Sequence, residues 1–165
     1  MQEKMTTVST KAIRALVHVS TGNPGTAVEA SKFLTGAFER IGAIERELVA
    51  TFLIELVVNE HAKLWARTMA AYTLGFWEDR RGGQVLLKVL NDPKNSVQLR
   101  DHAAEALGVL RFSKALATLA GLAASNKTPR KIKRSAIYAL EEIGGSKAEA
   151  LLEAIRKRRS RRSDR

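Results

Sequence analysis

The fold of this chain is decided by residues 99–108, which read LRDHAAEALG. The same pattern occurs earlier as ARTMAAYTLG at residues 66–75 and later as IKRSAIYALE at residues 132–141. A weaker fourth copy is AFERIG at residues 37–42. Four copies in one register, without an insertion, indicate a supersecondary unit that buries its apolar face by stacking on its neighbours.

The copies recur with a period of about 33 residues, and each unit is predicted to contain two helices. Both segments of a unit carry apolar or small residues at helical spacing, and alternating strand patterns are absent. The second helix contributes a column of leucines at the same stride, formed by Leu53, Leu86, Leu119 and Leu152. Trp77 falls in a column otherwise filled by Ile44, Leu110 and Ile143, so we expect its ring in the core.

Polar residues and glycines predict where the helices begin and end. Asn95 and Thr128 are predicted N-caps, and residues 26–29 and 146–149 read as capping boxes. The first helices are expected to end in tight turns at three glycines, Gly42, Gly75 and Gly108.

These patterns predict an all-α protein, a right-handed α-solenoid of about four helix pairs with an N-terminal helical cap. We expect residues 1–9 to be flexible, residues 10–30 to form the capping helix and a turn, residues 31–158 to form the repeats, and residues 159–165 to be an unstructured basic tail. No apolar run is long enough to span a membrane, and no signal peptide is recognisable, so we expect a cytoplasmic protein without membrane contact.

The repeats resemble HEAT-like repeats of the short type named after phycobilisome lyases. The resemblance rests on an arginine followed by Ala-Ala-x-Ala-Leu-Gly, best seen at residues 100–108, and covers about residues 31–158. It implies the solenoid fold and says little about function. Ankyrin repeats share the period, but every copy here lacks their Thr-Pro-Leu-His tetrapeptide.

Catalysis is not expected, and neither is a cofactor or a metal. The chain has no cysteine, which excludes thiolate chemistry and cysteine-ligated metals. The three histidines do not show metal-ligand spacing. Deoxyhypusine hydroxylase, which resembles this repeat, needs several His-Glu pairs after the repeated arginine, and only Asp101-His102 comes close here.

The basic ladder formed by Arg67, Arg100 and Lys133 has two interpretations. It could follow a phosphate backbone, or its side chains could bind loop carbonyls or Asp92 between repeats, which we favour. For the concave surface of the second helices, the predicted partner-binding residues are Trp65, Gln84, Lys88 and Lys114. Trp65 is the favoured contact because tryptophan is enriched at interfaces, although packing within the chain would explain it equally well.

The positive charge is concentrated at the C-terminus, where residues 127–165 carry +8 of the total +11. We predict a basic patch formed by Lys127, Arg130, Lys131, Arg134, Arg156, Lys157, Arg158, Arg159, Arg161 and Arg162. The leading hypothesis is a non-catalytic scaffold that binds another protein, acidic or otherwise, through its concave surface and this basic end. Nucleic-acid binding through the patch and an accessory role in a bilin-lyase-like enzyme are the alternatives.

Overall fold

The computed structural model describes residues 15, 18, 21–37, 40, 42–77 and 80–163. Within these residues the chain forms helices and no strand, which confirms the all-α class. The predicted flexible segment at residues 1–9 and most of the predicted capping helix lie outside the described residues. The helices are α2 (Pro24–Ala37), α3 (Ala43–Val58), α4 (Leu64–Leu74), α5 (Arg80–Asn91), α6 (Val97–Val109), the short 3-10 helix η2 (Ser113–Ala115), α7 (Leu116–Ala124), α8 (Arg130–Ile143) and α9 (Gly145–Ser163).

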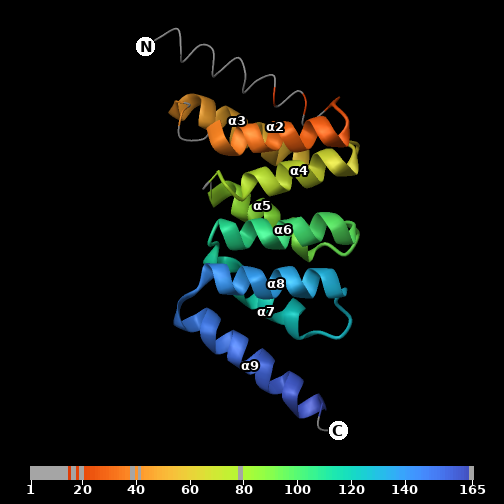
Figure 1. The fold of residues 1–165 in the computed structure, drawn as a ribbon, viewed down its shortest axis with the longest axis vertical. Coiled ribbons are helices and arrows are strands. Elements are labelled where there is room, and N and C mark those ends of the chain that lie inside the picture. The colour runs from red at the N-terminus through yellow and green to blue at the C-terminus, as the bar shows by residue number, and fades with distance from the viewer. Residues whose placement is uncertain are drawn as a thin grey trace. The chain divides into compact units, whose positions relative to one another are not determined.

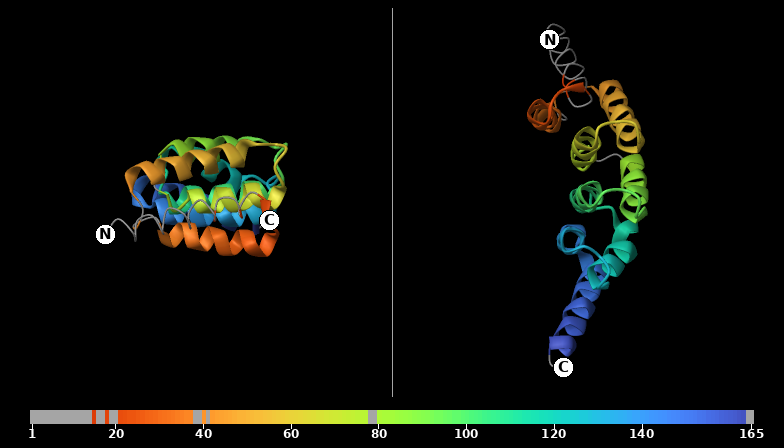
Figure 2. Two further views of the ribbon diagram at one scale, coloured as in Figure 1. Left: turned by 90° about the horizontal axis from the view of Figure 1, so that it is seen from above. Right: turned by 90° about the vertical axis from the view of Figure 1, so that its right-hand side faces the viewer.

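The chain divides into two compact units, Met1–Val85 and Leu86–Arg165. In the first unit α4 packs against both α2 and α3, and α2 and α4 form one layer with α3 in the other (Figures 1 and 2). A buried hydrogen bond of 2.5 Å between the hydroxyls of Ser31 and Thr73 joins α2 to α4. The fully buried side chains of this unit include Leu34, Leu53 and Leu74.

In the second unit α6 packs along α8, while α7 packs against α8 and α9 (Figure 1). The view in the right panel of Figure 2 shows α6 and α8 in one layer and α7 and α9 in the other. Leu99 and Leu107 of α6, with Ile132 and Leu140 of α8, are fully buried. Their burial is the main source of stability in this unit, because apolar area removed from water contributes about 25 cal/mol per Å².

The predicted columns agree with the observed burial in part, since Leu110 and Ile143 of the Trp77 column are only half-buried. All four leucines of the second-helix column are buried, and the ring of Trp77 is buried as predicted. Ile44, in the same column as Trp77, is instead 77% exposed. The alignment of Ile44 with core positions was therefore wrong.

Arg67 and Arg100 bind the ends of preceding helices. Nε of Arg67 donates to the carbonyl of Val57 at 2.9 Å, and Nε of Arg100 donates to the carbonyl of Leu90 at 2.9 Å. Both carbonyls lie in the last turn of a helix, where the backbone has no partner of its own and a cation is favourable. The favoured structural role is confirmed for these two arginines, although the acceptors are carbonyls at helix ends and not in loops. Donor and acceptor occupy the same positions of the repeat in both bonds.

Several predicted caps lie one to three residues from the observed ones. The α6 helix is capped by Ser96, whose Oγ accepts from the amide of Leu99 at 3.1 Å, and not by Asn95. At α8 the N-cap position is Pro129, not Thr128. At α2 the reciprocal pair is Asn23 and Thr26, with both amide-to-side-chain bonds at 3.0 Å, so the predicted box at residues 26–29 begins too late.

Of the three glycines, Gly75 ends a first helix in a turn as predicted, while Gly42 and Gly108 have other roles. Gly42 is the N-cap of α3, and Gly75 ends α4 in a right-handed conformation. Gly108 lies inside α6, where a Cβ atom would stand 2.7 Å from Cα of Ala139 in α8. The glycine is required there by the close approach of two helices, not by a turn.

The C-terminal segment is helical further than predicted. The α9 helix continues through Ser163, so the expectation of an unstructured tail is wrong for residues 159–163. In the part of the chain that the structure describes, no helix has both the length and the apolar character needed to cross a membrane.

Candidate functional site

The residues predicted for the concave surface are exposed with one exception. Gln84 and Lys88 are exposed residues of α5, and Lys114 is exposed in η2. Trp65, at the start of α4, is half-buried, and Nζ of Lys63 lies 5.8 Å from the centre of its ring. That position is suited to a cation–π contact, so part of the indole ring is engaged within the chain.

Most members of the predicted basic patch are exposed where the structure describes their side chains. Its exposed members whose side chains the structure describes are Lys127, Arg130, Lys131, Arg134, Arg156, Lys157 and Arg158. Nζ of Lys157 forms an ion pair with Glu153 at 2.6 Å, one turn earlier in α9. Arg159, Arg161 and Arg162 follow on the α9 backbone, but their side chains lie outside the description.

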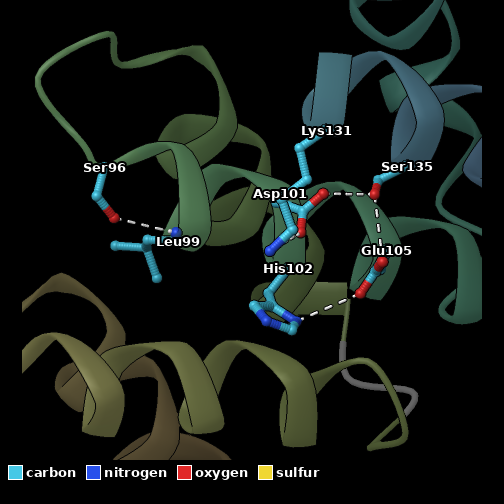
Figure 3. A network of polar contacts seen from close by, with 7 residues as sticks. All are labelled: Ser96, Leu99, Asp101, His102, Glu105, Lys131 and Ser135. Carbon is cyan, nitrogen blue, oxygen red and sulfur yellow. Dashed lines mark hydrogen bonds and ion pairs between the residues drawn. The ribbon is translucent and has the colours of Figure 1, made fainter. Parts of the chain in front are cut away.

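Lys131 is exposed like its neighbours in the patch, and its ammonium group also neutralises a buried carboxylate. Asp101 of α6 is only 1% exposed. Its Oδ2 lies 3.0 Å from Nζ of Lys131, and its Oδ1 accepts a hydrogen bond of 2.6 Å from Oγ of Ser135 (Figure 3). A buried charge must be paired and hydrogen-bonded to be tolerated, and both conditions are met here by α8.

Two further polar residues extend this cluster along α6. Oε1 of Glu105 accepts a hydrogen bond of 3.2 Å from Oγ of Ser135, and its Oε2 lies 3.3 Å from Nδ1 of His102 (Figure 3). The hydrogen-bonding contact with His102 lowers the pKa of Glu105, and burial opposes this effect. The charges of His102 and Lys131 and the hydrogen bond from Ser135 lower the pKa further.

The cluster has the residue types of a catalytic site but not the accessibility. Ser135 is 2% exposed, and its hydroxyl donates to carboxylates that are held in place by other groups. Among the described residues no group of three or more His, Cys, Asp or Glu side chains could hold a metal ion. We therefore interpret this cluster as a clamp between α6 and α8.

The lowered pKa of Glu105 predicts an acid-sensitive contribution to stability. A carboxyl group whose pKa is lower in the folded state stabilises the fold fully at a pH above its pKa in the unfolded state, which is 4.5 for glutamate. This contribution is lost as the pH falls through the pKa of the folded state. We expect the melting temperature of Glu105→Gln to fall less steeply below pH 4.5 than that of the unaltered chain. Parallel melting curves for the two proteins from pH 7 to pH 3 would contradict this role.

The α3 helix is apolar on two opposite faces. Its inner face carries the buried residues Val49, Leu53 and Val57. On its outer face Ile44 is 77% exposed, Leu48 is 64% exposed and Val58 is 50% exposed. A helix that is apolar all round is normally buried on all sides, so the outer face is suited to a further contact.

The outer residues of α3 follow a regular spacing. Steps of four, three, four and three residues lead along the helix through Ile44, Leu48, Thr51, Glu55 and Val58. These residues share one face of the helix, and we name them the outer seam. Sequence reasoning missed it because Ile44 and Leu53 were assigned to core columns and the opposite face of this segment was not considered. Apolar residues at helical spacing on both faces were a readable signal.

No known family model matches this chain. A comparison with curated proteins also finds no relative. The candidate site is thus chosen on physical grounds. The outer seam is the strongest candidate, because large exposed apolar side chains grouped on one face mark interaction sites more reliably than dispersed charges do.

Proposed function

We propose that this chain is a non-catalytic, right-handed α-solenoid of the HEAT-like type that binds another protein. The repeated sequence supports the solenoid, and so do the corresponding bonds of Arg67 and Arg100 and the two helical layers within each unit. Repeat proteins of this kind present extended surfaces made of many helices, and their usual ligands are proteins. Gln84, Lys88 and Lys114 stay predicted contacts on such a surface.

The observation that carries the proposal is the exposure of Ile44 and Leu48. Two large aliphatic side chains one turn apart are left mostly in water, at 77% and 64% exposure. Covering them with a partner would contribute about 25 cal/mol for each Å² of apolar area buried. Apolar anchors of this kind, surrounded by polar residues, supply most of the binding energy in protein interfaces.

Leu48→Ser is expected to reduce partner binding at least about tenfold without unfolding the chain. The substitution is at an exposed position, so the free energy of unfolding should change by no more than about 0.5 kcal/mol. The measurement is quantitative affinity capture from the cells of origin, followed by direct titration of the recovered protein. Val97→Ser, at a 42% exposed valine of α6, is the matched control.

The outcome has two separate parts. If no protein is recovered in stoichiometric amount with the unaltered chain, the scaffold proposal is wrong. If a protein is recovered and binds Leu48→Ser as tightly as the unaltered chain, the scaffold proposal holds and the outer seam is not its binding surface.

A second candidate function, nucleic-acid binding, is favoured by the exposed arginines of the second unit. Arg130 and Arg134 lie one turn apart on α8, and Arg156, Lys157 and Arg158 are exposed on α9. The helical extension of α9 through Ser163 places the remaining basic residues on a continuous helix. Arginine and lysine on a surface bind phosphates mainly by releasing counterions.

If this second function holds, the double variant Arg130→Ala and Arg134→Ala should weaken binding to a single-stranded oligonucleotide and flatten its salt dependence. Each lost phosphate contact reduces the slope of log K against log salt by about 0.7 for single strands. Fluorescence anisotropy of a labelled 20-nucleotide strand between roughly 50 and 200 mM salt measures both the affinity and its salt dependence. Lys32→Ala, an exposed lysine of α2, is the control, and absence of binding at low salt would rule this function out.

A further inference from the structure

We propose that the outer seam of α3 docks one amphipathic helix of another protein, and that this helix carries a lysine or arginine opposite Glu55. The inference rests on the proposed protein-binding function and names the chemistry of the partner. It follows from the spacing of the seam, from the position of one carboxylate within it, and from the poor fit of a second copy of this chain.

The spacing of the seam selects a helix as the partner. Alternating steps of four and three residues give the 3.5-residue period with which two helices pack side by side over several turns. From Ile44 to Val58 the seam covers roughly 21 Å at a rise of about 1.5 Å per residue. Ile44, Leu48 and Val58 would provide the apolar contacts, and a helix matches this period better than an extended strand, whose side chains repeat every two residues.

Glu55 selects a basic residue in the partner. Its exposed side chain occupies the fourth of the five seam positions, between Thr51 and Val58 on the same face. A helix docked on the seam would remove this carboxylate from water, which is unfavourable unless a cation pairs with it. A single polar residue at a seam position is also the usual means by which paired helices fix their register.

The flank of the seam carries a charge pair that is already balanced. Oε1 of Glu47, on the same helix, lies 3.6 Å from Nη1 of Arg81 in α5, and both side chains are largely exposed. An exposed pair of this kind contributes little to affinity. Glu55 is therefore the seam carboxylate that distinguishes one partner helix from another.

A second copy of this chain fits the seam poorly in either orientation. In an antiparallel pair, symmetric about Thr51, Leu48 of each copy would face the carboxylate of Glu55 in the other. In a parallel pair the two Glu55 side chains would face each other, and like charges at a seam position are destabilising. A different chain that carries a cation therefore fits the seam better than a second copy does.

The test uses two synthetic helical peptides that differ at one position, each about 21 residues long and so roughly six helical turns. Both have leucine at their seam positions and neutral glutamine and alanine elsewhere, except that the central seam position is lysine in one peptide and glutamate in the other. Binding of each fluorescent peptide at nanomolar concentration is measured by anisotropy against the full chain. The lysine peptide should bind at least about tenfold more tightly than the glutamate peptide.

This expected preference is opposite to the one that the overall charge would produce. The chain carries a net charge of +11, so non-specific attraction favours the glutamate peptide. Glu55→Lys should reverse the preference between the two peptides, and Leu48→Ser should weaken the binding of both. Glu149→Lys, at an exposed acid of α9, is the matched control and should leave the preference unchanged.

Three results would overturn the inference: equal binding of the two peptides, preference for the glutamate peptide, or a preference that Glu55→Lys does not change. Concentration-dependent dimerisation of the unaltered chain that Leu48→Ser abolishes would also overturn it, since a second copy would then occupy the seam. These outcomes would not contradict the proposed protein-binding function, because affinity capture can still recover a protein that binds at another surface.

Discussion

Gly108→Val is expected to lower the free energy of unfolding by about 3 kcal/mol, at the upper end of the usual cost of overpacking. A Cβ atom at this position would stand 2.7 Å from Cα and 3.0 Å from Cβ of Ala139. The obstacle is backbone, which cannot rotate away as a flexible side chain can. The α6 and α8 helices would have to separate, and the branched valine would force them further apart than alanine would.

The sign of this effect separates packing from helix propensity. Valine and alanine both favour a helix more than glycine does, so propensity alone predicts that the substitution stabilises the chain. Gly121→Val in α7 is the control, since a Cβ there has no neighbour within 4 Å, and we expect a change within about 0.5 kcal/mol. Urea unfolding measures both variants, and equal stability of the two would show that α6 and α8 do not approach so closely.

Lys131→Ala is also expected to destabilise the fold, by about 3 kcal/mol, the lower end of the cost of breaking a buried ion pair. The loss arises because Asp101, which is 1% exposed, would no longer have the ammonium group of Lys131 as its partner at 3.0 Å. The cost is at the lower end because the Lys131 side chain is itself 47% exposed and because Ser135 still donates to the carboxylate at 2.6 Å.

Two further variants check the cause of this loss. Arg134→Ala removes an exposed cation from the same helix and should change the free energy of unfolding by no more than about 0.5 kcal/mol. Asp101→Asn in the Lys131→Ala background removes the uncompensated charge and should restore part of the lost stability. If Lys131→Ala unfolds at the same urea concentration as Arg134→Ala, the lysine is an ordinary surface cation.

The two expected effects have a common structural origin. The absence of a side chain at Gly108 lets α6 lie close to α8, and this closeness brings Asp101 within 3.0 Å of Lys131 and 2.6 Å of Ser135. Gly108→Val should thus also weaken the clamp. The loss of stability in the double variant Gly108→Val and Lys131→Ala should therefore be smaller than the sum of the two single losses.

The sequence by itself determined the helical class and the core leucines, and it favoured a structural role for the repeated arginine. These features are periodic, and a period reports which face of each helix is apolar without knowledge of any distant contact. Arg67 and Arg100 could be interpreted as carbonyl ligands because they stand at the same place in successive copies of one motif. Caps were predicted less well, because a side chain one to three residues away can satisfy the same amide groups.

Only the tertiary structure decided which members of each column are buried, paired or exposed. Asp101 and Ser135 are 34 residues apart, and nothing local predicts that a carboxylate in one helix meets a hydroxyl and Lys131 in another. Ile44 shares a column with the buried Trp77 but is 77% exposed, because burial depends on the helices that surround a position and not on the motif that contains it. The outer seam follows from the same cause: sequence supplies apolar residues on both faces of α3, and packing against α4 covers one of those faces while the other stays exposed.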